Sequence, residues 1–118
     1  MSDDQHISDQ IRTHLHQAYN LDDDRIEALL PGFLAALSGY LDEMDAALTS
    51  QNRQELVRAV HRVKGALVNL GLEQLAGQTQ SLEATVRQQD TNINDRHIMD
   101  QARSLIGEIR SLVLNTAG

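Results

Sequence analysis

The chain has 118 residues, of which 41% are hydrophobic, enough for one domain with a single core, and its formal net charge is −7. That charge argues against binding to nucleic acid or to an anionic membrane surface, because both require basic patches. The absence of cysteine excludes disulfides and thiolate metal sites, and no apolar run approaches the roughly 20 residues of a membrane span. The acidic, polar N-terminus lacks the features of a signal peptide, so we expect a cytoplasmic location.

A short helix is predicted first, over about residues 4–18. Its apolar residues recur at helical spacing and are Ile7, Ile11, Leu15 and Ala18. Ser2 and Gln5 fit a capping box at its start. We expect this helix to pack across one end of the longer helices that follow.

A long helix is predicted next, over about residues 23–49, after an N-cap at Asp22. The apolar stripe predicted to face the core consists of Ile26, Leu30, Phe33, Leu37, Leu41, Met44 and Leu48. Pro31 and Gly32 interrupt this pattern, because proline lacks a backbone donor and disfavours helical geometry in the residue before it. We therefore expect a kink or a break at Pro31.

A third and a fourth helix are predicted to form an antiparallel pair. The third covers residues 53–69 or 53–70, and Asn52 with Glu55 forms a capping pattern at its start. Gly71 is expected to end it in the left-handed C′ position, and the turn is so short that the fourth helix must fold back. The fourth helix is predicted over about residues 72–89. Its inward positions are Leu72, Leu75, Thr79, Leu82 and Val86.

The last helix is predicted over about residues 95–114, after a polar turn at residues 90–94. Its inward residues are Ile98, Ala102, Leu105, Ile109 and Leu112. The tail, residues 115–118, is expected to fray. The pattern as a whole predicts an all-α fold, namely an antiparallel up-down four-helix bundle with an additional short N-terminal helix. We expect a single domain over residues 1–118, with its core bundle at about residues 23–114.

His61 is predicted to point out of this bundle. The apolar stripe of its helix consists of Leu56, Val60, Val63, Leu67 and Leu70. At about 100° per residue, His61 lies roughly 140° from the centre of that stripe. Lys64 and Gly65 follow at i+3 and i+4, so both lie beside the histidine on the helix surface. Val57 and Val68, about 40° and 20° from His61, would form a partly exposed apolar rim.

The neighbours of His61 favour the approach of an anionic group. Glycine inside a helix costs about 0.5–1 kcal/mol relative to alanine, which suggests that Gly65 keeps bulk away from the imidazole. The cation at Lys64 would stabilise any anion brought next to the ring.

Metal binding and other catalytic chemistry have little support. His6, His14 and His16 do not share a helix face at zinc-ligand spacing, and no Glu-x-x-His pair of a di-iron bundle occurs. Asp22, Asp23 and Asp24 lack the alternating spacing and central glycine of a calcium loop. We find no spacing typical of a nucleophile triad and no Gly-rich phosphate loop, so we expect no metal and no binding of ATP.

The residues around His61 resemble a histidine-containing phosphotransfer (HPt) domain. The resemblance is carried by the H-x-x-K-G core of His61, Lys64 and Gly65, the pair Leu70-Gly71, the following LEQLAGQTQSLE and the upstream LLPGFLAAL. It covers roughly residues 26–87 and is closest to the module at the C-terminus of hybrid sensor kinases.

This resemblance implies that His61 accepts a phosphoryl group from an aspartyl phosphate of one receiver domain and passes it to another. A neutral imidazole is a good nucleophile near neutral pH, Lys64 would stabilise the phosphoryl group, and Gly65 would give steric access. The receiver of a response regulator or hybrid sensor kinase would supply the aspartate and the bound Mg²⁺. The chain itself would then need no cofactor and would have no ATP-dependent kinase activity.

The same resemblance places the receiver on the face around His61, and we expect the chain to act as a monomer. The residues expected to contact the receiver are Gln54, Val57, Arg58 and Val68, whereas Gly71 is expected to be structural. On the neighbouring helix, Gln78 or Glu83 is expected to bond the second nitrogen of His61 and orient the ring.

Two other functions fit a helical bundle. The phosphoacceptor dimerisation domain of a histidine kinase would need an acidic residue directly after the histidine, but Arg62 stands there. A non-catalytic adaptor or scaffold would use the bundle alone, and substitution of His61 would then change neither its folding nor its activity.

Overall fold

The computed structural model describes residues 3–88 and 92–117, and these residues form five α-helices and no strand. The helices are α1 (Asp3–Tyr19), α2 (Asp23–Ser50), α3 (Arg53–Asn69), α4 (Glu73–Arg87) and α5 (Arg96–Ala117). The predicted helix boundaries agree with these to within a few residues. Ser2 of the predicted capping box and residues 89–91, at the end of the fourth predicted helix and the start of the polar turn, lie outside the described residues.

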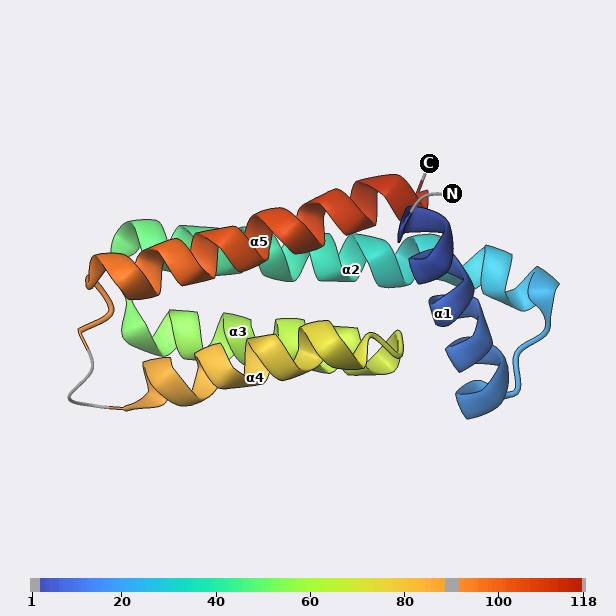
Figure 1. Cartoon of the computed structure of the whole chain (residues 1–118), viewed down its shortest axis with the longest axis horizontal. Helices are drawn as coiled ribbons and strands as arrows, with labels where there is room; N and C mark the ends of the chain where they lie inside the picture. The colour runs from blue at the N-terminus through green and yellow to red at the C-terminus, as the bar shows by residue number, and fades with distance from the viewer. Residues whose placement is uncertain (1–2, 89–91, 118) are drawn as a thin grey trace.

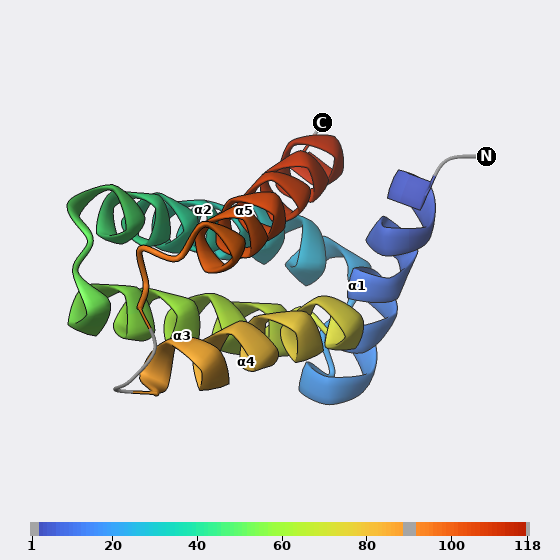
Figure 2. The same ribbon diagram turned by 60° about the vertical axis from the view of Figure 1, so that its left-hand side comes forward.

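Helices α2 to α5 lie lengthwise beside one another (Figure 1). The colours show that each of the four runs opposite to the one before it, as their short connections require. Viewed from the side, α2 and α5 form one layer and α3 and α4 the other (Figure 2). Helix α1 crosses one end of these four helices, as predicted, and contacts both α2 and α5.

The core is aliphatic, and most of the predicted stripes are buried in it. Leu37, Leu41 and Met44 of α2, for example, have no exposed surface. The prediction for Phe33 was wrong, because its side chain is 36% exposed whereas Leu34 is 3% exposed. Both residues fit helical spacing from Leu30, at i+3 and i+4. Leu34 is the buried one because it lies on the face of α2 that packs on the core.

Helix α2 continues through Pro31, so of the two predicted alternatives, a kink or a break, the break was wrong. A proline inside a helix costs roughly 3 kcal/mol or more. Ile26, Leu30 and Leu34 are buried on both sides of it, and each buried aliphatic side chain contributes about 1.5–3 kcal/mol. Pro31 itself is exposed. The burial on either side therefore outweighs the cost of the interruption.

Local contacts define the ends of the helices. The Asp22 side chain accepts a hydrogen bond from the backbone N–H of Arg25, and the Asn52 side chain accepts one from that of Glu55, as N-caps do. Helix α5 extends to Ala117, so the prediction of a frayed tail was wrong for the described residues. Its last turns pack beside α1.

Helix α3 ends at Asn69, and Gly71, just beyond the C-cap residue Leu70, has φ +76°. The N–H of Leu72 donates to the carbonyl of Leu67, and the N–H of Gly71 to that of Val68, each at 3.0 Å. This pair of bonds is the Schellman motif, and it confirms the predicted left-handed C′ glycine. None of the helices within the described ranges combines the length and the apolarity needed to cross a membrane.

Candidate functional site

His61 lies near the middle of α3 with its side chain 60% exposed. The neighbouring stripe residues Val60 and Val63 are fully buried. The outward orientation predicted from helical spacing is therefore confirmed, and the ring is accessible to another protein.

Glu83 of α4 lies directly behind the imidazole. Its Oε2 is 3.1 Å from Nδ1 of His61, and its side chain is only 6% exposed. Glu83 neighbours the buried positions Leu82 and Val86, so packing of α4 on α3 brings the carboxylate to the histidine. Of the two predicted partners of His61, Glu83 is confirmed and Gln78 is not, because Gln78 is exposed beside α5.

Two cations hold the Glu83 carboxylate. Lys64 Nζ lies 2.9 Å from Oε1, and Arg87 donates to Oε2 from Nε at 3.0 Å and from Nη2 at 2.7 Å. The Lys64 side chain is 25% exposed, so it lies partly inside the network rather than on the open surface. Arg87 was missed by the sequence reasoning, although its i+4 spacing from Glu83 is the usual signal of a helix ion pair.

These contacts keep Glu83 ionised. Burial by itself raises the pKa of this carboxyl, but the contacts with Lys64, Arg87 and His61 outweigh it and lower the pKa from 4.5 to about 2. An ionised carboxylate only accepts hydrogen bonds, so the neutral imidazole must carry its proton on Nδ1. Nε2 then holds the free lone pair and points away from Glu83.

The two glycines of the motif have different surroundings. A Cβ at Gly65 would meet no atom within 4 Å, so this position is open surface one turn from His61. A Cβ at Gly71 would collide with the His14 side chain, and the Gly71 carbonyl accepts a hydrogen bond from Gln10. Gly71 therefore allows α1 to approach the turn between α3 and α4, in line with a structural role.

Apolar surface adjoins His61 on α3. Val68 is 53% exposed, whereas Val57 is half-buried against the core. Gln54 and Arg58 are exposed, and Arg58 pairs with Glu55 at 3.0 Å. A groove that the sequence reasoning missed runs between α2 and α3. Its lining residues are Phe33, Ala36, Tyr40, Arg62, Gly65, Ala66, Asn69 and Leu70.

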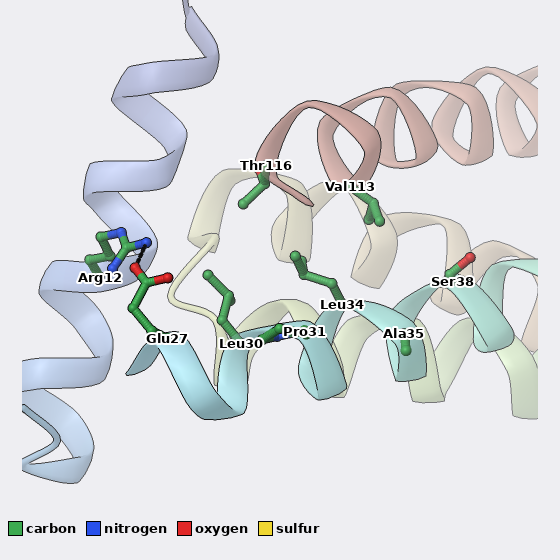
Figure 3. A pocket seen from close by; sticks show the side chains of 9 residues that line it. All are labelled: Arg12, Glu27, Leu30, Pro31, Leu34, Ala35, Ser38, Val113 and Thr116. Atoms are coloured by element: carbon green, nitrogen blue, oxygen red, sulfur yellow. Dashed lines mark ion pairs between the residues drawn. The ribbon is translucent and has the colours of Figure 1, made fainter. Parts of the chain in front are cut away.

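A second hollow lies near α1 (Figure 3). Leu30, Leu34 and Val113 form much of its wall, and an ion pair between Arg12 and Glu27 closes one side. Because this pair neutralises itself and His61 is not among the lining residues, the hollow has no part in the site.

A family model of the Hpt domain matches residues 28–112. The chain belongs to the Hpt domain family. Hpt domains carry out histidine phosphotransfer in phosphorelays, in which they interact with receiver domains. The match spans His61, Lys64, Glu83 and Arg87 but not α1, so the whole charge network lies within the Hpt domain. No curated protein and no solved structure matched the chain.

Proposed function

We propose that this chain accepts a phosphoryl group on His61 from the aspartyl phosphate of one receiver domain and passes it to another. One observation carries the proposal: in an Hpt domain, the exposed imidazole of His61 is bonded through Nδ1 to a buried carboxylate. For the architecture of the domain we propose the predicted antiparallel up-down four-helix bundle, formed by α2 to α5. We take residues 1–118 as a single domain.

Nε2 is the atom that we assign to phosphoryl transfer. Its lone pair attacks phosphorus, the N–P bond forms as the bond to the aspartyl oxygen breaks, and the aspartate leaves as a carboxylate with the electron pair. The ring gains positive charge in this step, and the anionic Glu83 beside Nδ1–H stabilises it. The reverse sequence of bond changes delivers the group to the second receiver.

Lys64 and Gly65 have supporting roles in this proposal. The ammonium group of Lys64 has three donors, so it can contact Glu83 and a phosphoryl oxygen together. Open space at Gly65 lets a second protein approach the ring closely. The receiver would supply Mg²⁺ along with its aspartate, and this chain would need no cofactor or ATP.

The docking face that we propose for the receiver is the exposed side of α3. Val68 and the partly buried Val57 offer apolar contacts on either side of His61, and Gln54 and Arg58 offer polar ones. The groove between α2 and α3 extends this face past Gly65. We expect a monomeric, cytoplasmic protein that uses this face for each receiver in turn and binds no nucleic acid.

The test is transfer of label from a phosphorylated receiver domain to this chain. Wild-type protein is compared with His61→Gln, and His97→Gln serves as the matched control because His97 is an exposed histidine on α5. We expect acid-labile, alkali-stable label on the wild type and on His97→Gln, and none on His61→Gln.

Two results would contradict the proposal. Label that persists on His61→Gln would mean that another residue is the acceptor. A folded wild-type chain that takes no label from any of several receivers would favour the scaffold function instead.

A further inference from the structure

The charge of this protein is unevenly distributed. The segment from Arg53 to Arg87, which contains α3 and α4, has five basic and three acidic residues, a formal charge of +2. The remainder has five basic and fourteen acidic residues, a formal charge of −9. Helices α3 and α4 thus carry a net positive charge in a strongly acidic molecule.

Part of this basic charge lines one groove, between the first turns of α3 and the last turn of α4. The residues that line it are Arg53, Gln54, Val57, Arg58 and Arg87, and we call it the arginine groove. Among the described residues that line it, three are cations and none is a carboxylate. A groove of this composition favours an anion on electrostatic grounds.

The three arginines are held differently. Arg53 donates to the carbonyls of Val86 at 2.7 Å and Gln88 at 2.5 Å, which fixes one wall of the groove against the end of α4. Arg58 pairs with Glu55, but both side chains are more than half exposed, and such pairs contribute only about 0–1 kcal/mol. A carboxylate from outside can therefore replace Glu55 at little cost.

Arg87 connects the arginine groove to the histidine. Its Nε and Nη2 donate to the same oxygen of Glu83 that bonds Nδ1 of His61. Its Nη1 has no partner in the described part of the chain, and the side chain is 56% exposed. An anion bound to Nη1 would thus contact the side chain that holds Glu83, and Glu83 orients the imidazole.

We propose that the arginine groove binds an acidic segment of the partner protein, through carboxylates paired with Arg58 and Arg87. Arginine pairs with carboxylates in two-pronged geometry, and Gln54 and Val57 suit the amide and apolar parts of a peptide. Nucleic acid is a poorer occupant, because the −9 charge on the remainder repels a polyanion of high charge density. This proposal adds a binding contact to the proposed function. It rests on that function for the identification of the partner as a receiver domain.

The test measures binding without any phosphoryl group. A short polyglutamate peptide is titrated into the uniformly ¹⁵N-labelled chain, and amide, arginine side-chain and imidazole resonances are followed. We expect saturable shifts at Arg58, Arg87 and the His61 ring, and we expect binding to weaken as salt is added. The double variant Arg58→Gln/Arg87→Gln should bind at least about threefold more weakly.

Arg103→Gln is the matched control. Arg103 is an exposed arginine on α5 that pairs with Asp45, away from the groove, and its substitution should leave peptide binding unchanged. Circular dichroism checks that all variants are folded. Equal loss of binding in Arg103→Gln and the double variant, or an oligodeoxynucleotide that binds more tightly than the peptide, would overturn the proposal.

The proposal for the arginine groove and the proposal for phosphoryl transfer can be refuted separately. Label transfer to His61 with no peptide binding would refute only the arginine groove. Peptide binding that follows the expected pattern, with no label on His61 from any receiver, would refute only the relay and support an acidic partner of another kind.

Discussion

Replacing Glu83 by glutamine isolates the charge behind His61. The amide keeps the size of the carboxyl and can still accept a hydrogen bond from Nδ1, but it cannot pair with cations. Lys64 and Arg87 would lose the anion that they hold at 2.9 Å and 2.7 Å. The substitution should therefore destabilise the protein even though it removes no apolar contact.

The expected loss follows from the pKa. A fall in the pKa of Glu83 from 4.5 to about 2 corresponds to roughly 3 kcal/mol of added stability for the ionised form, at about 1.4 kcal/mol per unit. Because the pKa is lower in the folded state, the unfolded chain binds the proton first as the solution is acidified. The stabilisation is thus complete above pH 4.5 and is lost as the pH falls toward 2.

Urea unfolding at a series of pH values measures this effect. At pH 7 we expect Glu83→Gln to have a free energy of unfolding about 3 kcal/mol lower than the wild type, and we expect the gap to close in acid. Glu108→Gln, an exposed carboxylate on α5, is the control and should change stability by less than about 0.5 kcal/mol. A gap at pH 7 no larger than that of the control, or one unchanged by acid, would refute the buried network.

Three further substitutions test the local structure, each by urea unfolding. Gly71→Ala should cost more than about 1 kcal/mol, because the left-handed backbone is strained for alanine and its Cβ would collide with His14; an unchanged stability would exclude this contact. Gly65→Ala should stabilise α3 by up to about 1 kcal/mol and slow label transfer, whereas unimpaired transfer would remove the proposed steric role. Asn52→Ala should cost about 1 kcal/mol as an N-cap loss, and no loss would mean that the cap is replaced by water.

Much of the fold follows from local rules, and these could be applied to the sequence directly. Helical spacing of apolar residues gave the five helices, and short connections gave the direction of each. Asn52 and Gly71 identified the two ends of α3, because caps depend on residues close in sequence. The outward orientation of His61 followed from the same periodicity.

Competition between local helix preferences and tertiary packing explains the wrong predictions for α2. At Pro31 the local rule gave the cost of a proline correctly, but only the packed structure shows how much burial surrounds it. At Phe33 and Leu34 two neighbouring residues satisfied the same spacing, and only the packing of α2 on its neighbours decides between them.

The charge network depends on register between helices, which spacing within one helix does not give. Glu83 was one of two possible partners for His61 until the packing of α4 on α3 placed it behind the ring. Arg87 had a visible signal in its i+4 spacing, and the basic excess of residues 53–87 could have been counted in the sequence.

The network also explains why stability and reactivity are divided between different residues. A buried carboxylate is costly unless it is paired, and Lys64 and Arg87 pair both oxygens of Glu83 without the histidine. Reaction at His61 therefore does not leave a buried charge without partners. The single bond from Nδ1 contributes little to folding by comparison, yet it fixes which nitrogen is free to react. The carboxylate can thus stabilise the bundle through two cations while directing the chemistry through the imidazole.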